Sequence, residues 1–155
     1  MNNNDILRRI RYTFNFTDLK MAELFNLSNH KVTPTQISCW LKKDDDPDYM
    51  EINDKQMSIF LNGFIDYKRG KKEGVQPKPE KSLNNNIILR KLKIALNLKD
   101  IDMINIFDLA DMRISKHELS AFFRNPSQNQ YRTCKDQFLR NFLYGMQIKY
   151  RKNKK

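Results

Sequence analysis

At 155 residues the chain is long enough for one domain or two small ones, and its 39% hydrophobic and 30% charged residues are typical of a globular protein. It contains no apolar run of roughly eighteen residues, so no membrane-spanning helix and no membrane partner are expected. The formal net charge of +11 divides into +2 over residues 1–72 and +9 over residues 73–155. A basic second half favours an anionic partner, although a genome rich in Lys and Asn codons would produce the same bias.

Several classes of protein find no support in the sequence. The N-terminal segment MNNNDILRRIRYTF lacks the layout of a secretory signal, so we expect a cytoplasmic location. Cys39 and Cys134 occupy non-equivalent positions of the repeat described below, which indicates reduced thiols. His30 and His117 have no Cys or carboxylate partner at ligand spacing, and no nucleotide-binding loop or catalytic acid pair is present. We therefore expect a non-enzymatic protein without metal or cofactor.

The chain contains two copies of one unit. When residues 4–72 are laid on residues 86–154 without a gap, 17 of the 69 positions are identical. The identical pairs include Arg8 with Arg90, Asp54 with Asp136, and Gly63 with Gly145. A gap-free match of this length indicates an internal duplication.

The copies are separated by RGKKEGVQPKPEKSL, residues 69–83, which is charged, contains Gly and Pro, and has little apolar surface to bury. We therefore divide the chain into a first helical repeat over residues 1–70, a linker over 71–83, and a second helical repeat with a basic C-terminal tail over 84–155. The sequence does not predict how the two repeats pack together.

Each repeat is predicted to form four helices. In the first, about 5–15, apolar residues recur every three or four positions, and Asn3 or Asn4 is the expected N-cap. The second, about 18–28, carries an apolar face that includes Leu19 and Leu27. The fourth spans 54–69, with a twin at about 135–150. No strand-like alternation competes, so the predicted fold class is all-α: two tandem four-helix repeats joined by a Pro/Gly/charged linker.

The third helix, within residues 32–43, has the strongest local signals. Thr33 is the expected N-cap, Pro34 fits the first helical position, and Gln36 completes a capping box. Ser115 and Glu118 repeat this box in the second copy. The apolar stripe of this helix also recurs in the second copy, which leaves a polar face pointing outward.

The second and third helices together have the outline of a helix-turn-helix unit. In such units, polar residues at the front of the recognition helix reach base edges in the major groove, and nearby cations contact phosphate. The residues at these positions are Thr35, Gln36, Ser38, Lys42 and Lys43. The turn is longer than usual, so a plain helical hairpin with a solvated face is the alternative. The acidic segment 44–48 lacks EF-hand spacing and is expected to be a surface loop facing away from phosphate.

Basic residues of the second repeat provide the other predicted contacts with nucleic acid. They lie on its third helix, in the loop that follows, on its fourth helix and in the tail: Lys116, Arg124, Arg132, Lys135, Arg140, Lys149, Arg151 and Lys152. Cations interleaved with tyrosines suit sequence-independent phosphate contact and base stacking. A solvated, frayed tail is the alternative for the C-terminal members.

Arg8 and Arg90 are identical in the two copies and lie on helices that are otherwise apolar on one side. We expect them to pair with Asp54 and Asp136, which are also identical, in preference to binding a ligand.

The opening NDILRRIRY, the segment KMAELFNLSNHKVTPTQISCWLKK and the order and spacing of the two copies resemble the bacterial YehS-like family over essentially the whole chain. This resemblance implies a small, all-helical, non-secreted bacterial protein of unknown function, and it carries over no catalytic or binding residue. From the residues we predict a protein that binds DNA or RNA through its helix-turn-helix-like repeats and basic second half. The alternative is a helical module that binds a protein partner or a second copy of itself.

Overall fold

The computed structural model describes residues 1–151, and over that range it consists of eight helices joined by loops. The helices are α1 (Asn3–Phe14), α2 (Asp18–Leu27), α3 (Pro34–Leu41), α4 (Asp54–Arg69), α5 (Asn85–Ala95), α6 (Asp100–Leu109), α7 (Lys116–Phe122) and α8 (Asp136–Tyr150). The predicted fold class, all-α with two tandem four-helix repeats, is confirmed. None of the described helices is both long enough and apolar enough to cross a membrane.

The helices begin at polar caps that largely recur in both repeats. The side chain of Asn2 caps α1 and that of Asn84 caps α5, so the predicted N-cap of the first helix, Asn3 or Asn4, is wrong. The reason is that both side chains are used elsewhere: Asn3 donates to the Asp54 carboxylate, and Asn4 is buried and donates to the carbonyl oxygen of Trp40. The capping box of Thr33 and Gln36 at α3 is confirmed, as is the equivalent box at α7.

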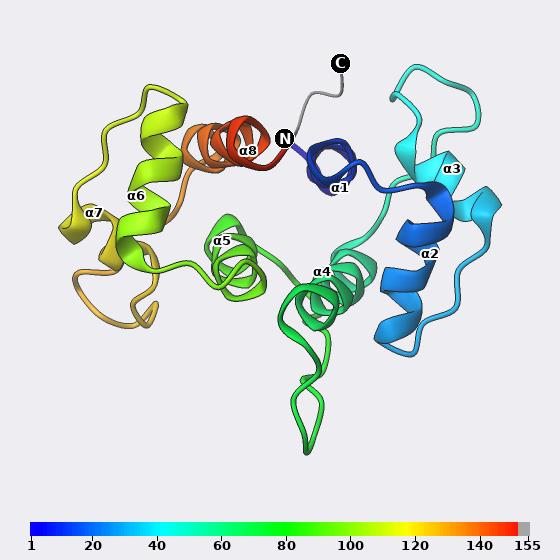
Figure 1. Ribbon diagram of the computed structural model, residues 1–155, viewed down its shortest axis with the longest axis horizontal. Helices are drawn as coiled ribbons and strands as arrows, with labels where there is room; N and C mark the ends of the chain where they lie inside the picture. Colours follow the sequence, from blue (N-terminus) through cyan, green and yellow to red (C-terminus); the bar gives the residue numbers. More distant parts are fainter. Residues whose placement is uncertain (152–155) are drawn as a thin grey trace.

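Four helices, α1, α4, α5 and α8, form the centre of the molecule. Figure 1 views them nearly end-on, with α2 and α3 on one side and α6 and α7 on the other. The first helix of each repeat packs mainly against the last helix of the other repeat, α1 on α8 and α5 on α4. Because one continuous apolar cluster runs through both repeats, the two copies share a single core.

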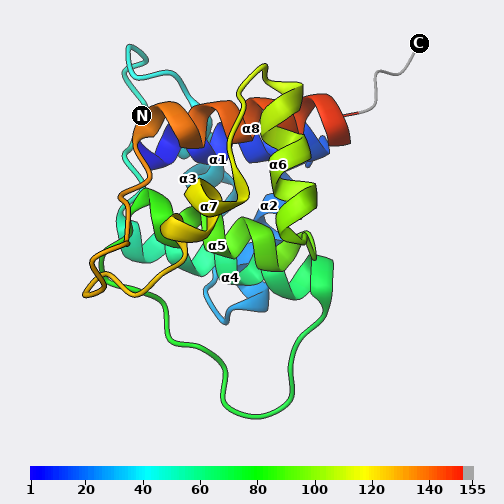
Figure 2. The same ribbon diagram turned by 90° about the vertical axis from the view of Figure 1, so that its left-hand side faces the viewer.

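The paired central helices run parallel, with their starts at the same end. The Met1 amine donates to the Asp136 carboxylate at 3.4 Å where α1 and α8 begin, and the Leu83 amide donates to Asp54 at 3.0 Å where α4 and α5 begin. A parallel pair requires the chain to return along the length of α4, about 24 Å for its sixteen residues. The linker makes this return as a long loop (Figure 2).

Two glycines bring the outer helices close to the centre. A Cβ at Gly63 of α4 would lie 1.8 Å from the carbonyl oxygen of Leu24 in α2. A Cβ at Gly145 of α8 would lie 2.0 Å from the carbonyl oxygen of Ile106 in α6. This backbone contact explains why glycine occurs at the same position of both repeats.

The outer faces of α2 and α6 carry exposed aliphatic side chains. Leu19 and Leu27, which the sequence pattern assigned to the apolar face of α2, are 69% and 38% exposed. Their equivalents on α6, Ile101 and Leu109, are 59% and 43% exposed. The assignment of Leu19 and Leu27 to the buried face is therefore wrong, because α2 turns a different side, containing Leu24, toward α4.

Candidate nucleic-acid interface

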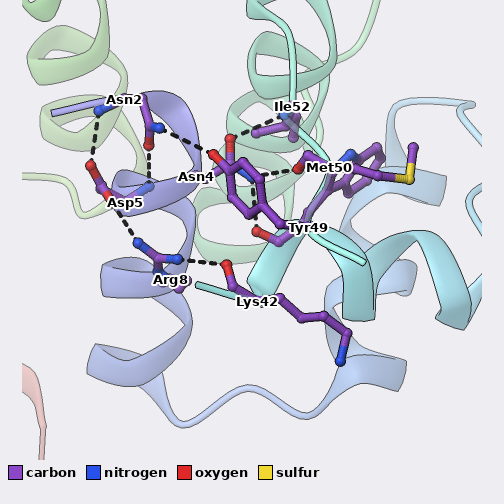
Figure 3. Close-up of polar contacts among 9 residues, drawn as sticks. Asn2, Asn4, Asp5, Arg8, Lys42, Tyr49, Met50 and Ile52 are labelled. Atoms are coloured by element: carbon purple, nitrogen blue, oxygen red, sulfur yellow. Dashed lines mark hydrogen bonds and ion pairs between the residues drawn. The ribbon is translucent and has the colours of Figure 1, made fainter. Parts of the chain in front are cut away.

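A buried asparagine at the start of α1 holds the loop that joins α3 to α4. The Asn4 amide donates to the carbonyl oxygens of Trp40 at 2.9 Å and Met50 at 2.8 Å, and it accepts from the Ile52 amide at 3.1 Å (Figure 3). All three partners are backbone groups, so the clamp does not depend on the side chains of the loop.

The second repeat contains the same clamp. The Asn86 amide donates to the carbonyl oxygens of Phe122 at 3.0 Å and Arg132 at 2.8 Å, and it accepts from the Cys134 amide at 2.9 Å. Each partner occupies the position that the gap-free alignment of the repeats makes equivalent to its counterpart in the first. Both loops are therefore attached to the core at equivalent points.

The two clamped loops carry opposite charge. The acidic loop, residues 42–53, contains two lysines and five acidic residues, a net charge of −3. The basic loop, residues 124–135, contains Arg124, Arg132 and Lys135 and no acidic residue, a net charge of +3. One backbone arrangement thus presents two surfaces of opposite sign.

Among the described residues the cations of the basic loop form no direct ion pairs, although the Glu118 carboxylate lies in the same pocket as Arg132 and Lys135. Arg132 and Lys135 are exposed, and Arg124 donates a hydrogen bond to the side-chain oxygen of Gln130. Within residues 1–151 none of these three cations forms an ion pair. Tyr131 lines a pocket together with Arg132, Lys135 and Glu118. Exposed cations beside an aromatic ring can contact phosphates and stack on a base.

A second basic feature, the arginine groove, lies between α1 and α8 and has a volume of about 470 Å³. Its lining residues are Met1, Asp5, Arg8, Arg9, Tyr12, Arg140 and Gln147. Arg9 makes only a long contact, 3.5 Å, with the side-chain oxygen of Gln147. Arg140, predicted from the sequence, is thereby brought beside two arginines of the first repeat. The groove exists only because the two repeats pack together.

Arg8 does not make the predicted pair with Asp54. One of its guanidinium nitrogens contacts the Asp5 carboxylate at 2.5 Å, and another donates to the carbonyl oxygen of Lys42 at 2.7 Å (Figure 3). Arg90 likewise donates to a backbone carbonyl, that of Phe123, at 3.3 Å.

The two aspartates, Asp54 and Asp136, are occupied elsewhere. Their carboxylates accept hydrogen bonds from the side-chain amides of Asn3 and Asn85, at 2.7 Å and 2.8 Å. Asp54 also accepts from the backbone amide of Leu83, and Asp136 from the Met1 amine. The predicted pairing is therefore wrong in both repeats, and Arg8 and Arg90 tether the end of the third helix.

The predicted contacts of the first repeat, Thr35, Gln36, Ser38, Lys42 and Lys43, lie on α3 and immediately after it. Figure 1 shows α3 on the side of the molecule opposite α7. The Gln36 side-chain oxygen is used by the capping box, whereas Thr35 is exposed and Ser38 is half-buried. The acidic loop begins directly at Lys42, so five acidic residues follow these positions.

The remaining predicted contacts lie at separate places in the second repeat. Lys116 is exposed at the first residue of α7, and Lys149 is exposed near the end of α8. Arg151 stacks over the Tyr12 ring, 3.7 Å from its centroid, and so lies close to the arginine groove. Lys152 lies outside the described residues.

The sequence did not predict that Arg9 lines the arginine groove, nor that Arg8 tethers the end of α3. The identity of Asn4 and Asn86 in the two copies was a signal for the clamp, because a polar residue that is kept and buried needs a hydrogen-bond partner. No signal in a single repeat could reveal the arginine groove, whose two walls come from different repeats.

Comparisons with known proteins agree with the repeated architecture. Residues 3–70 and 85–152 each match the family described as "Protein of unknown function (DUF1456)". The chain is 41% identical over 147 residues, 94% of either chain, to a protein of Escherichia coli (strain K12) named "Uncharacterized protein YehS". No solved structure matches the chain. The resemblance inferred from the sequence is confirmed.

Proposed function

The chain belongs to this family of unknown function, and we propose that it binds nucleic acid through the basic loop and the arginine groove. The partner is recognised by its phosphate backbone, because the available groups are guanidinium and ammonium cations with few hydrogen-bond acceptors. Binding is therefore largely independent of base sequence. Tyr131 and Tyr12 supply aromatic rings for stacking on unpaired bases.

The observation that carries this proposal is the opposite charge of the two clamped loops. Asn4 and Asn86 hold both loops through backbone groups alone, so the fold itself does not require cations in one and acids in the other. Exposed cations that form no direct ion pairs within residues 1–151 favour an anionic partner, since each phosphate contact releases a condensed counterion. Arg140 on α8 extends the basic loop toward Arg9 in the arginine groove.

The proposal assigns no base-reading role to α3. The acidic loop that follows it would repel phosphate at short range. The six residues between the end of α2 and the start of α3 also exceed the usual turn of a helix-turn-helix unit. Phosphate contact is therefore assigned to the second repeat and α1.

Fluorescence anisotropy with labelled single-stranded RNA, single-stranded DNA and duplex DNA tests the proposal. We expect affinity to fall steeply between about 50 and 200 mM salt, with a log–log slope of about −0.9 for each duplex phosphate contact. Replacing Arg124, Arg132, Lys135 and Arg140 by Ala should weaken binding and flatten that slope.

A charge-matched control keeps this test specific. Lys31, Lys71, Lys72 and Lys78 are exposed and lie in the α2–α3 loop and the linker, outside the basic loop and the arginine groove, and replacing them by Ala removes the same formal charge. We expect this variant to retain most of the affinity and slope. Equal losses in the two variants, or salt-insensitive binding, would contradict the assignment of the surface.

A second candidate function rests on the exposed aliphatic residues of α2 and α6. Leu19, Leu27, Ile101 and Leu109 occupy equivalent positions on the two outer helices, and exposed apolar residues at corresponding places suit contact with a protein partner or a second copy. A dimer that persists at high salt in light scattering, and that Leu19→Ser with Ile101→Ser dissociates, would favour this function.

A further inference from the structure

The groove between α4 and α5 contains an anion supplied by the chain itself. The Glu80 carboxylate of the linker accepts a hydrogen bond from the Ser58 hydroxyl at 2.5 Å and lies 3.1 Å from the Lys91 ammonium group. The Glu80 amide donates to the same Ser58 hydroxyl oxygen at 3.0 Å, and Lys91 also donates to Asn62 at 2.6 Å. The Glu80 carboxylate is thus held between Ser58 of α4 and Lys91 of α5.

This arrangement favours the charged form of the carboxyl group. Burial would raise the pKa of Glu80, but hydrogen bonds from Ser58 and Lys91 outweigh that effect, and the pKa is lowered. Ser58 is fully buried and Lys91 is 8% exposed, so both donors are fixed by packing. The groove between α4, the last helix of the first repeat, and α5, the first helix of the second, can therefore hold an oxyanion.

The arginine groove is the counterpart of this groove in the other half of the molecule. In the gap-free alignment of the two repeats, Arg9 on α1 is equivalent to Lys91, and Arg140 on α8 is equivalent to Ser58. Both arginines line the groove. Among the described residues neither forms an ion pair, whereas the neighbouring Arg8 is engaged with Asp5.

We propose that Arg9 and Arg140 bind a phosphoryl group at the position that corresponds to the Glu80 carboxylate. Two guanidinium groups offer more donors and more charge than an ammonium and a hydroxyl group, which suits a tetrahedral phosphoryl oxyanion better than a carboxylate. Tyr12 lies in the same groove with Arg151 stacked on it, a surface on which a base next to the phosphate can stack. The inference rests on the proposed function only for the source of the phosphate, a nucleic acid.

Inorganic phosphate is the direct probe of this site. Titration with potassium phosphate at constant ionic strength, followed by the side-chain Nε–H signals of arginine in ¹⁵N NMR, should shift Arg9 and Arg140 and leave Arg113 in place. An equal titration with acetyl-glutamate amide should produce weaker shifts. A glutamate derivative that binds more tightly than phosphate would overturn the assignment to a phosphoryl group.

Substitution identifies the donors. Arg9→Gln and Arg140→Gln should each weaken phosphate binding about tenfold, the scale of one charge-assisted hydrogen bond. Arg9→Lys keeps the charge but loses the planar, bidentate guanidinium group, so its phosphate affinity should lie between those of the wild type and Arg9→Gln. The matched control, Arg113→Gln with Lys55→Gln, removes two exposed cations elsewhere and should leave phosphate binding unchanged. Unfolding curves of each variant verify that the fold is retained.

The two proposals fail in distinguishable ways. If a folded Arg9→Gln/Arg140→Gln variant still binds phosphate, the site is wrong whatever the oligonucleotides do. If wild type binds phosphate at this site but no oligonucleotide, the site stands and nucleic-acid binding is wrong. If oligonucleotides bind with an unchanged salt slope in the double variant, the function stands and the phosphoryl site is wrong.

Discussion

The two repeats differ far more on their surfaces than in their cores. The clamp formed by Asn4 recurs with Asn86, and the glycine contact of Gly63 recurs with Gly145. In contrast, the loops held by these clamps carry −3 and +3. The comparison indicates that a small set of buried residues maintains the duplicated architecture and leaves the exposed residues free to diverge.

The grooves between the repeats diverge in the same way. Lys91 and Ser58 hold a carboxylate of the linker in one, whereas Arg9 and Arg140 line the other without a carboxylate from the linker. The duplication produces two related grooves, each between the first helix of one repeat and the last helix of the other. Only one of them is next to the linker (Figure 2). The linker therefore makes the two grooves chemically different.

The largest expected effect concerns the shared core. Gly63→Ala and Gly145→Ala would each bring a Cβ within about 2 Å of a carbonyl oxygen, a distance that only movement of a helix can relieve. We expect each to lower the free energy of unfolding by about 3 kcal/mol or more. Urea unfolding followed by circular dichroism measures both, with Lys55→Ala on an exposed helical site as the control. If one glycine tolerated alanine, the equivalence of the two repeats would be broken.

The second-largest loss of stability is expected when the asparagine clamps are removed. Asn4→Ala leaves two backbone carbonyls and one amide without their side-chain partner, and Asn86→Ala does the same in the second repeat. We expect a loss of about 2 kcal/mol in each case, since water can reach part of each site. Hydrogen exchange of the Ile52 and Cys134 amides should accelerate locally. A loss confined to one repeat would indicate that the loops are held differently.

The sequence predicted the helices well because the signals that define them are local. Caps such as Thr33 with Gln36, and the apolar spacing of α4, lie within a few residues of the helix starts they specify. The start of α1 was misplaced because Asn2, Asn3 and Asn4 all have capping side chains. The tertiary contacts of Asn3 and Asn4 decide that Asn2 is the asparagine that remains available.

The candidate site was predicted only in part because it depends on packing between repeats. Arg140 was identified from the basic composition of its segment, but Arg9 gave no such signal in a near-neutral half of the chain. Arg8 was paired with Asp54 because both are identical in the repeats, yet identity shows only that each has a role. The contacts of Arg8 with Asp5 and a backbone carbonyl follow from where α3 ends.

A smaller effect on the free energy of unfolding is expected from Glu80, which occupies only one of the two grooves. Glu80→Gln removes a charged hydrogen bond to Lys91, and we expect a loss of about 1 kcal/mol at neutral pH, because Glu80 is 36% exposed and water screens the pair. The pKa of Glu80 is lowered from 4.5, so its stabilising contribution is complete above that value and is lost as pH falls through the folded-state pKa. The difference in unfolding free energy between wild type and Glu80→Gln should therefore shrink in acid. Glu73→Gln, exposed in the same linker, should show no such difference.

The smallest expected effect tests whether the acidic loop is remote from the bound nucleic acid. Asp44→Asn, Asp45→Asn, Asp48→Asn and Glu51→Gln neutralise four exposed acids and change the loop charge from −3 to +1, while Asp46 is kept because its carboxylate accepts from the Asp48 amide at 2.8 Å. Long-range repulsion falls, so we expect affinity at low salt to rise by about two- to threefold, the scale of interactions between exposed charges. The gain should vanish near 1 M salt, where the Debye length is about 3 Å. A gain of tenfold or more in anisotropy titrations would mean that nucleic acid contacts the first repeat as well, and the distinction between an acidic and a basic loop would no longer define the interface.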